Sequence, residues 1–429
     1  MKERIAIVDG KRSAFLKAGT EFKTIDADDI GAQTLRRFML SSQVGYRQID
    51  EVIVGNVSQP SKAANVARVL ALKAGFSDTV PAYSVQRNCA SGMEAVSTAI
   101  NKILAGYADI VVAGGTESMT NIPFLYSSKM KAFFERLSRS RSMVSTLSTL
   151  STFKLGYLKP TIGLLDGLTD PVCGQIMGVT AENLAKEFSI TRAQQDEYAL
   201  QSHLKALKAQ QAGFFDEEIV CSFIVNGKVV VVEQDNGPRQ DQDIQKLAKL
   251  RPYFDRKYGT VTVGNACPIT DGAAMMTLMT ESMAKKLKYD VLGYVTAYDY
   301  AGLEPHRMGL GPVYAVSKVL DRTGLTLNDI DLFEMNEAFA AQIIANVRAF
   351  ESKDFAKTCL GKSKPIGQLD MDRFNIHGGA IALGHPVGAT GARLLITLLR
   401  SLKQKKLKRG CASLCVGGGQ GAAFIVEAD

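Results

Sequence analysis

Residues 84–96, SVQRNCASGMEAV, decide the local fold and contain the first candidate for chemistry. The apolar residues within 80–85 predict a short buried strand, and those within 93–104 recur at helical spacing. The small residues at 90–92 leave room for a sharp turn between them. Cys89 is therefore expected near a helix N-terminus, where unpaired N–H groups and the helix dipole favour a thiolate. A buried structural cysteine is the alternative, because cysteine is among the most buried residue types.

The sequence around this unit alternates strands with helices, which favours a layered α/β domain. A glycine pair at 114–115 is expected to turn the chain after the strand that follows the helix. Two helices are expected within 178–210, with Thr180 and Thr191 as caps. Other expected strands lie at 4–8, 51–55, 109–113 and 229–233, and other expected helices at 30–40 and 65–74.

The second half of the chain resembles the first from about residue 259 onward. IDEVIV at 49–54 corresponds to IDLFEM at 330–335, and ADIVVAGG at 108–115 corresponds to CASLCVGG at 411–418. Two similar α/β halves packed together would bring corresponding loops to one cleft, because ligands favour the carboxyl ends of strands in such sheets.

Composition limits the class of protein. The 429 residues exceed one typical domain, and 46% hydrophobic and 22% charged residues are ordinary for a soluble globular protein. The seven cysteines are scattered and odd in number, which argues for a reducing compartment without a disulfide framework. With no signal peptide or membrane span recognised, a cytoplasmic location is expected. The net charge of +8 suits anionic ligands, and no motif for nucleic-acid binding accompanies it.

Two glycine-rich stretches in the second half carry residues suited to acid–base chemistry. In NIHGGAIALGHPVGATGAR at 375–393, His385 precedes an apolar helix and could activate a thiol or donate to an oxyanion. A structural histidine is the commoner case. CVGGG at 415–419 places Cys415 at a strand end, before a glycine turn with free N–H groups, where it could act as an acid or base.

A third stretch, NEAF at 336–339, begins an apolar helix. Asn336 could bind a ligand there, or it could simply cap the helix. A metal site is not expected, because Cys411 and Cys415 have no second cysteine pair at ligand spacing elsewhere in the sequence.

Together these motifs resemble the thiolase family. NCASGMEAV, NEAFA, GGAIALGHPVGATGAR and CVGGGQGAA occur in the family's order, and GTVTVGNACPITDGAA at 259–274 and MGVTAENLAKEF at 177–188 extend the resemblance. It implies a five-layered αβαβα fold made of two similar halves, with an inserted loop domain. The N-terminal half is expected at 1–121 and 259–289, the inserted domain at 122–258, and the C-terminal half at 290–429.

The resemblance also implies roles for single residues. Cys89 matches the acylated nucleophile, and His385 matches the histidine that takes its proton and faces the thioester oxygen. Cys415 matches the cysteine that moves the proton of the substrate α-carbon. Asn336 matches the asparagine that holds a water in one oxyanion hole, and the N–H groups of Cys89 and Gly417 match a second hole. CoA would be a substrate, and no cofactor is expected.

Three further positions bear on the substrate. Arg239 falls where the family often has an arginine near the CoA nucleotide. Short-chain thiolases usually have a histidine where Ile176 stands in this sequence. They usually have a serine near the pantetheine where Cys267 stands. Both changes argue against acetoacetyl-CoA as the only substrate. Asn336, in contrast, is the residue that short-chain thiolases have at its position. The expected reaction is cleavage of 3-ketoacyl-CoA or condensation of two acetyl-CoA, with chain length left open.

The resemblance implies partners as well. Thiolases are dimers, often paired into tetramers, and the long insert and DNGPR at 235–239 resemble β-subunits of fatty-acid oxidation complexes. Within 122–170, basic residues accompany aromatic and apolar residues at helical spacing. A hydratase/dehydrogenase α-subunit or an anionic membrane is the expected partner of this segment, and a lid over the loop domain is the alternative.

Two other classes of protein stay open at this stage. A ketoacyl-carrier-protein synthase-like condensing enzyme would normally use histidine-based chemistry where Cys415 stands. A non-catalytic acyl-CoA- or lipid-binding relative would not need to retain Cys89, His385 and Cys415.

Overall fold

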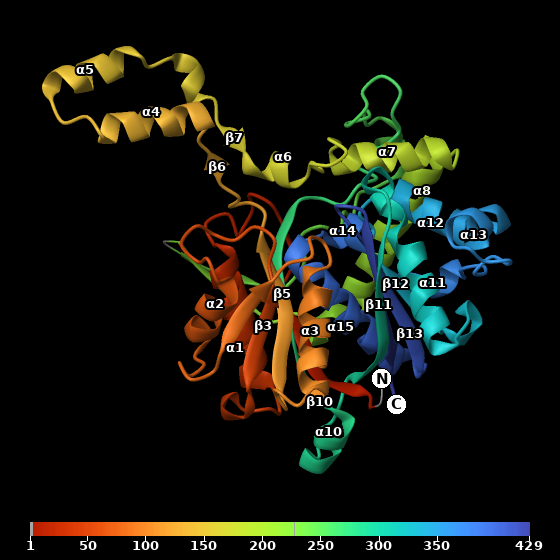
Figure 1. Cartoon of the computed structure of the whole chain (residues 1–429). Coiled ribbons are helices and arrows are strands. Elements are labelled where there is room, and N and C mark those ends of the chain that lie inside the picture. The colour runs from red at the N-terminus through yellow and green to blue at the C-terminus, as the bar shows by residue number, and fades with distance from the viewer. Residues whose placement is uncertain (1–2, 227) are drawn as a thin grey trace.

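The computed structural model describes residues 3–226 and 228–429. Its main sheet contains β1 (Ile5–Arg12), β2 (Leu16–Lys17), β3 (Glu51–Gly55), β4 (Ala82–Val85), β5 (Val111–Ser118), β10 (Thr270–Thr280), β11 (Gly293–Gly302), β12 (Leu332–Met335), β13 (Arg409–Val416) and β14 (Gln420–Glu427). Among the described residues the strands follow the order β12-β13-β14-β11-β1-β10-β5-β3-β4, and β2 pairs with β10 (Figure 1).

The strand pairings confirm the internal repeat. In the N-terminal half, β4, β3 and β5 pair in parallel, and β10 and β1 continue the sheet in antiparallel fashion. In the C-terminal half, β12 and β13 are parallel, and β14 and β11 follow in antiparallel fashion. A single parallel bridge between Phe333 and Phe374 stands where the first half has β4. The halves join where residues 5–7 of β1 pair with residues 293–295 of β11.

Helices separate and cover the two halves, which confirms the expected αβαβα layers (Figure 1). The outer helices are α1 (Ala27–Ser41) and α2 (Val66–Ala74) on the N-terminal half, and α11 (Gly311–Thr323) and α12 (Ala340–Glu351) on the C-terminal half. The inner helices, α3 (Ser91–Leu104) and α15 (Val387–Lys405), lie side by side between the halves.

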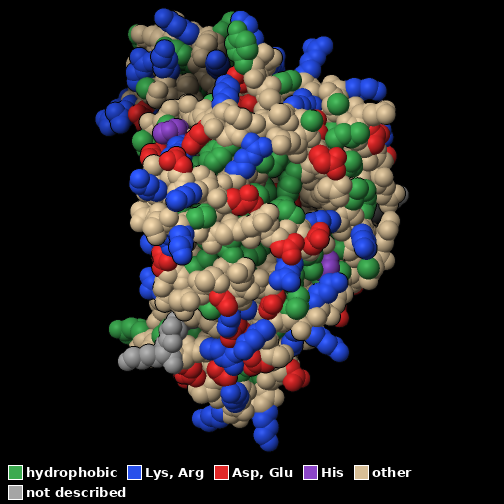
Figure 2. Space-filling view, turned by 90° about the vertical axis from the view of Figure 1, so that its right-hand side faces the viewer, with side chains coloured by type: hydrophobic (Ala, Val, Ile, Leu, Met, Phe, Trp, Pro, Cys, Tyr) green, Lys and Arg blue, Asp and Glu red, His purple; other side chains and the backbone are tan. Residues whose placement is uncertain are grey.

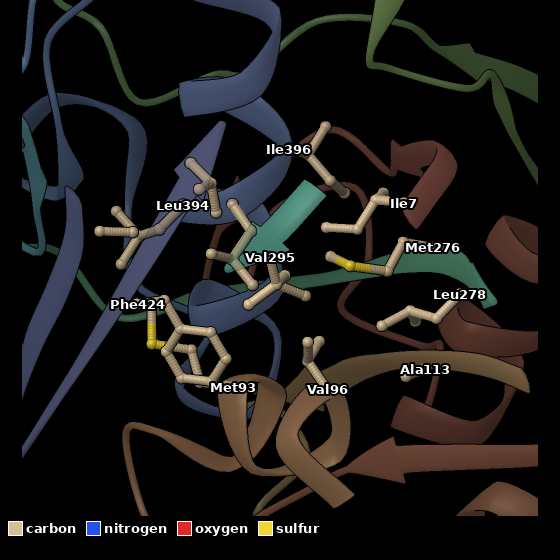
Figure 3. Close-up of a cluster of buried hydrophobic side chains, with 14 of the residues drawn as sticks. Ile7, Met93, Val96, Ala113, Met276, Leu278, Val295, Leu394, Ile396 and Phe424 are labelled. Atoms are coloured by element: carbon tan, nitrogen blue, oxygen red, sulfur yellow. The ribbon is translucent and has the colours of Figure 1, made fainter. Parts of the chain in front are cut away.

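Each central strand is buried on both faces because its alternate side chains enter different layers. In β3, Val52 and Val54 pack with the outer helices, whereas Ile53 joins the inner core with α3 and α15. Figure 3 shows this inner core, in which Met276 of the N-terminal half and Phe424 of the C-terminal half belong to one group of apolar side chains. Burial of this shared apolar surface holds the two halves together.

The glycine pair at 114–115 is not a turn, so the expectation from the sequence is wrong. β5 runs through both residues to Ser118. A Cβ atom on Gly114 would lie 2.1 Å from the carbonyl oxygen of Ala274, and one on Gly115 would lie 1.8 Å from that of Gly388. The pair therefore lets the main chains of β10 and α15 approach β5 closely.

The other elements connect these layers. They are α4 (Ser128–Ser138), α5 (Met143–Ser151), α6 (Gly163–Gly167), α7 (Met177–Glu187), α8 (Arg192–Gln211), α9 (Ile244–Ala248), α10 (Glu281–Leu287), α13 (Lys353–Cys359), α14 (Ala380–Leu383), β6 (Phe124–Leu125), β7 (Thr161–Ile162), β8 (Ser222–Asn226) and β9 (Lys228–Val232). Thr191 caps α8 as expected. Thr180 does not cap a helix, because it lies inside α7 and its hydroxyl donates to the carbonyl oxygen of Met177.

α4 and α5 form a helical hairpin that extends away from the main sheet (Figure 1). Phe133 is buried within it and packs against Phe153 and Tyr157. Most large apolar side chains of this segment are exposed, which speaks against a lid that buries its apolar side. The exposed set includes Phe124, Leu125, Tyr126, Phe134, Met143, Val144, Leu147, Leu150, Leu155 and Leu158.

The outer surface of the C-terminal half carries mixed charge. Figure 2 shows acidic and basic side chains interspersed over the middle and lower parts of this face, with basic side chains more frequent at its upper left. In the described part of the chain, no helix combines the length and apolar character needed to cross a membrane.

Candidate active site

Cys89 lies between β4 and α3, two residues before the helix begins. Asn88 adopts a left-handed conformation with φ of 43°, and its side-chain amide donates to the carbonyl oxygen of Gly417 at 2.8 Å. The second half repeats this connection, because Asn375 follows the bridge at Phe374 and also has φ of 43°. Asn88 and Asn375 therefore turn the chain in the same way after corresponding segments of the two halves.

His385 immediately precedes the Pro386 cap of α15, and the first turns of α3 and α15 touch through their main chains. A Cβ atom on Gly92 would lie 2.9 Å from the carbonyl oxygen of Gly388. This contact brings the N-termini of the two inner helices together. Cys89 and His385, which precede these helices, consequently lie at the same end of the inner layer.

The imidazole of His385 is only 5% exposed. Burial, and next the charge of Arg393, lowers its pKa to about 3, so the ring is neutral near pH 7. Its Nε2 atom has no hydrogen-bond partner among the described residues. A neutral ring with a free nitrogen can accept a proton from a thiol or contact a ligand.

The structure corrects the expectation that the helix N-terminus lowers the pKa of Cys89. Burial raises the pKa of this thiol, and the raising effect exceeds the lowering effect of the main-chain N–H groups of Gly417 and of Cys89 itself. The buried carboxylate of Glu117 raises it slightly further. Cys89 therefore needs a base to become a nucleophile.

Two other thiols lie close enough to interact electrostatically with Cys89. Cys415 is buried in β13, and burial followed by the charges of Cys89 and Cys267 raises its pKa well above the ordinary value. Burial, and then the charge of Cys89, raises the pKa of Cys267 to about 12. All three groups are protonated thiols near pH 7, so each has a proton to give.

Gly417 begins the turn that links β13 and β14, as the sequence predicts. Gly418 and Gly419 follow in left-handed conformations, with φ of 90° and 77°. A Cβ atom on Gly419 would lie 2.2 Å from the carbonyl oxygen of Leu303, so this position requires glycine. The main-chain N–H groups of Gly417 and of Cys89 itself both lower the pKa of the Cys89 thiol, which makes them candidates for oxyanion donors.

Asn336 follows β12 and is fully buried. It does not cap the following helix, because α12 begins at Ala340 with Phe339 at its N-cap. The main-chain N–H of Asn336 donates to the carbonyl oxygen of Ser413, whereas neither polar atom of its side chain has a partner among the described residues. Unpaired buried amide atoms point to a water or ligand site.

Sequence reasoning missed Glu337, although it stands beside Asn336 in the NEAF motif. Its buried carboxylate accepts hydrogen bonds from Tyr198 and Ser202 of α8, from the Asn375 amide and from the Ile381 N–H of α14, at 2.6–3.2 Å. One carboxylate thus ties the segment that bears Asn336 to the elements that lead to His385.

Arg239 is exposed and is not among the clustered thiols. Its main-chain N–H donates to Nδ1 of His203, and Gly237 nearby packs so closely on α14 that a Cβ atom would lie 2.1 Å from the carbonyl oxygen of Ala382. Burial and the charge of Arg239 lower the pKa of Lys17, which shows that two cations lie near each other. Neither cation forms an ion pair within the described residues.

The structure thus brings Cys89, Cys267, Cys415 and Gly417 together, places His385 at the same end of the inner layer, and leaves Arg239 apart. Throughout residues 3–226 and 228–429, no group of three or more His, Cys, Asp or Glu side chains is placed to hold a metal ion.

Comparison with known proteins identifies the architecture. The family model for the thiolase N-terminal domain matches residues 5–282, and that for the thiolase C-terminal domain matches residues 289–428. A 3-ketoacyl-CoA thiolase of Aliivibrio fischeri is 40% identical over 428 residues, covering 100% of this chain and 96% of that protein. The human mitochondrial trifunctional enzyme subunit beta is 40% identical over 425 residues, covering 99% of this chain and 88% of that protein.

Solved structures give the same result. The acetyl-CoA acetyltransferase of Bacillus anthracis superposes with a TM-score of 0.87 at 37% identity, covering 100% of this chain and 99% of that one. Human mitochondrial 3-ketoacyl-CoA thiolase in complex with CoA superposes with a TM-score of 0.85 at 32% identity, covering 100% of this chain and 98% of that one. These relatives and solved structures match this chain over essentially its full length, and the chain belongs to the thiolase family.

Proposed function

We propose that this protein is a thiolase that cleaves 3-ketoacyl-CoA with CoA, as in fatty-acid oxidation, and that can also run the reverse condensation. The observation that carries the proposal is the surroundings of Cys89. The main-chain N–H groups of Gly417 and Cys89 lower the pKa of its thiol, the Cys415 thiol is close enough to interact with it electrostatically, and a neutral His385 lies at the same end of the inner layer. Acyl transfer through a thioester requires these groups: a nucleophile, a base, oxyanion donors and a second acid.

The proposed cleavage begins when the Cys89 proton passes to Nε2 of His385. The thiolate attacks the ketone carbon, the carbon–carbon bond breaks, and the enolate of acetyl-CoA leaves. Cys415 gives its proton to the α-carbon of this enolate and becomes a thiolate. It then takes the proton of incoming CoA, whose sulfur attacks the Cys89 thioester. The released Cys89 thiolate recovers its proton from His385, which closes the cycle.

Under this proposal CoA is a substrate, and the thiols and imidazole act without a metal or resident cofactor. The unpaired cations Lys17 and Arg239 support a place for the phosphates of CoA beside the turn at 236–238. Cys267 would lie along the pantetheine, because its N–H donates to the carbonyl oxygen of Ala338 in the segment that follows Asn336. The cytoplasmic location stays a prediction.

The proposal is tested by thiolysis of acetoacetyl-CoA and of 3-ketoacyl-CoAs with longer chains, in the presence of free CoA. The wild-type protein should cleave at least one of these esters, and Cys89→Ser should lose at least a thousandfold in kcat, since the nucleophile is removed. Absence of cleavage for every chain length would overturn the proposal and favour a non-catalytic acyl-CoA-binding relative. Cleavage confined to carrier-protein esters would favour a synthase-like enzyme.

A homodimer, alone or paired into a tetramer, is the proposed assembly. β4 supports it, because no strand among the described residues pairs with the outer edge of this last strand, and its residues after Ala82 are only partly buried. A free edge is a ready template for pairing with another chain. Light scattering of the purified protein tests the proposal, and a monomer at micromolar concentration would contradict it.

The α4–α5 hairpin is proposed as a docking element for a hydratase/dehydrogenase α-subunit or an anionic membrane. Its exposed apolar residues and its basic residues support this, as does the likeness to trifunctional enzyme subunit beta. Charge reversal at Lys131, Arg136, Arg139 and Arg141 should abolish low-salt co-sedimentation with anionic vesicles or capture of an α-subunit, and leave thiolysis intact. Charge reversal at Lys285, Lys286 and Lys288, around the end of the distant α10, is the matched control. Equal association of both variants would refute docking by the hairpin.

A further inference from the structure

The hydroxyl of Thr390 makes two short contacts in the first turns of α15. Its oxygen lies 2.7 Å from Nδ1 of His385, and it donates to the carbonyl oxygen of Pro386 at 3.0 Å. A hydroxyl has one proton and can accept further hydrogen bonds. When that proton is directed to Pro386, whose carbonyl oxygen also accepts the N–H groups of Ala389 and Thr390, the Thr390 oxygen is left to accept from an Nδ1–H of His385.

We infer that Thr390 is a positioning residue that fixes neutral His385 as the Nδ1–H tautomer and so leaves Nε2 bare to take the proton of Cys89. The role of Thr390 in catalysis rests on the proposed function. The tautomer of His385 can be measured whether or not the protein is enzymatically active. Thr390 touches neither the thiol nor the substrate carbonyl in this role.

The surroundings of the ring agree with this assignment. Nε2 has no partner among the described residues, and the ring is buried, so no solvent contact competes for the proton. After Cys89 gives up its proton, both ring nitrogens are donors, and Thr390 still accepts from Nδ1 without turning its hydroxyl. Nε2–H is then the proton that faces the substrate oxygen. The opposite tautomer would occupy Nε2 beforehand and block the transfer.

Another histidine, His203, provides an internal reference for the opposite tautomer, with the proton on Nε2. The main-chain N–H of Arg239 donates to Nδ1 of His203, so this neutral ring must carry its proton on Nε2. With four histidines in the sequence, the two tautomers can be told apart in one sample. Magic-angle-spinning ¹⁵N NMR of protein labelled only at histidine Nδ1 reports each nitrogen as protonated or bare, and His385→Gln assigns the His385 signal.

The expected spectrum at pH 7.5 shows protonated Nδ1 in His385 and bare Nδ1 in His203. Thr390→Val retains the shape of threonine but cannot accept, so the His385 signal should shift toward bare Nδ1. Its kcat for thiolysis should fall at least tenfold, with KM for the CoA ester changed less than twofold, because a positioned general base typically contributes about 10²–10⁴ in rate. Thr390→Ser should restore both the signal and the rate.

Thr397→Val is the matched control on the same helix, since the Thr397 hydroxyl donates to Glu218, away from the histidine. It should leave the His385 signal and the rate unchanged. Bare Nδ1 in wild-type His385, or a normal rate and signal in Thr390→Val, would overturn the inference. Protonated Nδ1 in a wild-type protein that lacks thiolysis would instead refute the proposed function and leave the tautomer assignment standing.

Discussion

At the scale of single residues, the three thiols and the imidazole of the site are uncharged near pH 7. Burial raises the pKa of the Cys89, Cys267 and Cys415 thiols and lowers that of His385 to about 3. A thiolate–imidazolium pair is therefore not the resting state. Proton transfer from Cys89 to His385 has to accompany attack, when the developing oxyanion can draw on the N–H groups around the sulfur.

Alkylation of Cys89 by iodoacetamide provides a test of this charge state. Because the pKa of the thiol is raised, its alkylation rate should still increase with pH above the range in which a free cysteine is already mostly ionised. The rate is measured by mass spectrometry of the Cys89 peptide between pH 6 and 10, with an unfolded sample as control. A plateau reached below pH 8 would contradict a partly buried thiol with a raised pKa.

Replacement of Cys415 separates its role from that of Cys89. Cys415→Ala should still accept an acetyl group from acetyl-CoA, because the nucleophile and its N–H neighbours remain. Cleavage of acetoacetyl-CoA should fall at least a hundredfold, since no acid is left for the enolate. Cys411→Ala, four residues earlier on β13, is the matched control and should retain cleavage. Near-normal thiolysis by Cys415→Ala would remove this cysteine from the mechanism.

The positions of the reactive residues could be predicted from the sequence, but their charge state could not. Cys89 is identified by its place before a helix and by its motif. The shift in its pKa depends on how deeply the second half of the chain buries it, which no local pattern reports. Glu337 and Thr390 were missed for the same reason, because their partners come from segments distant in sequence or from a turn whose geometry only the fold defines.

At the scale of elements, the strands and helices expected from periodicity are present, whereas the role of one glycine pair was misjudged. Gly114 and Gly115 read as a turn because glycine is the commonest turn residue. In the structure they continue β5, and they are small because β10 and α15 approach on either side. Close approach between main chains leaves no trace in the local sequence, so only the tertiary structure distinguishes the two uses of glycine.

Gly115→Ala tests this close packing. The new methyl group would lie 1.8 Å from the carbonyl oxygen of Gly388, and main-chain atoms must move to admit it. The expected loss is about 3 kcal/mol or more in the free energy of unfolding, measured by urea denaturation. Gly302→Ala is the control, because no atom lies within 4 Å of a Cβ atom at that position on β11. Equal stability of the two variants would show that β5 and α15 are not tightly packed.

At the scale of the whole molecule, the repeat in the sequence predicted the two halves, and the strand pairings confirm them. The boundaries of the inserted domain stay a prediction. The extended hairpin could be foreseen only as amphipathic helices, because an exposed apolar surface carries the same sequence signature as a buried one. Its exposure follows from where the preceding strands place it, away from any neighbouring layer.

Two buried histidines, His203 and His385, and the partly buried His377 make the stability of the molecule sensitive to acid. The pKa is lowered to about 4 for His203 and His377 and to about 3 for His385, chiefly by burial. Since the unfolded chain takes up protons at a pKa near 6.5, their stabilising contribution is present above that pH. It is lost as the pH falls toward 4, at up to ~1.4 kcal/mol per pH unit for each histidine.

His377→Phe isolates one of these contributions. The new ring can still stack on Phe214, whose centroid lies 3.6 Å from that of His377. The free energy of unfolding should therefore decrease less steeply between pH 6.5 and pH 4 than in the wild type, while the two curves run parallel above pH 7. Urea denaturation at intervals of half a pH unit measures both slopes, and identical slopes in the acid range would contradict the low pKa of His377.

The central claim is that Cys89 carries the acyl group. Incubation of the wild-type protein with acetyl-CoA, followed by rapid acid quenching and peptide mass spectrometry, tests it most directly. We predict one acetyl group per chain, located on Cys89 and removed by added CoA. An acetyl group on Cys415 or Cys267 with Cys89 unmodified would contradict the account.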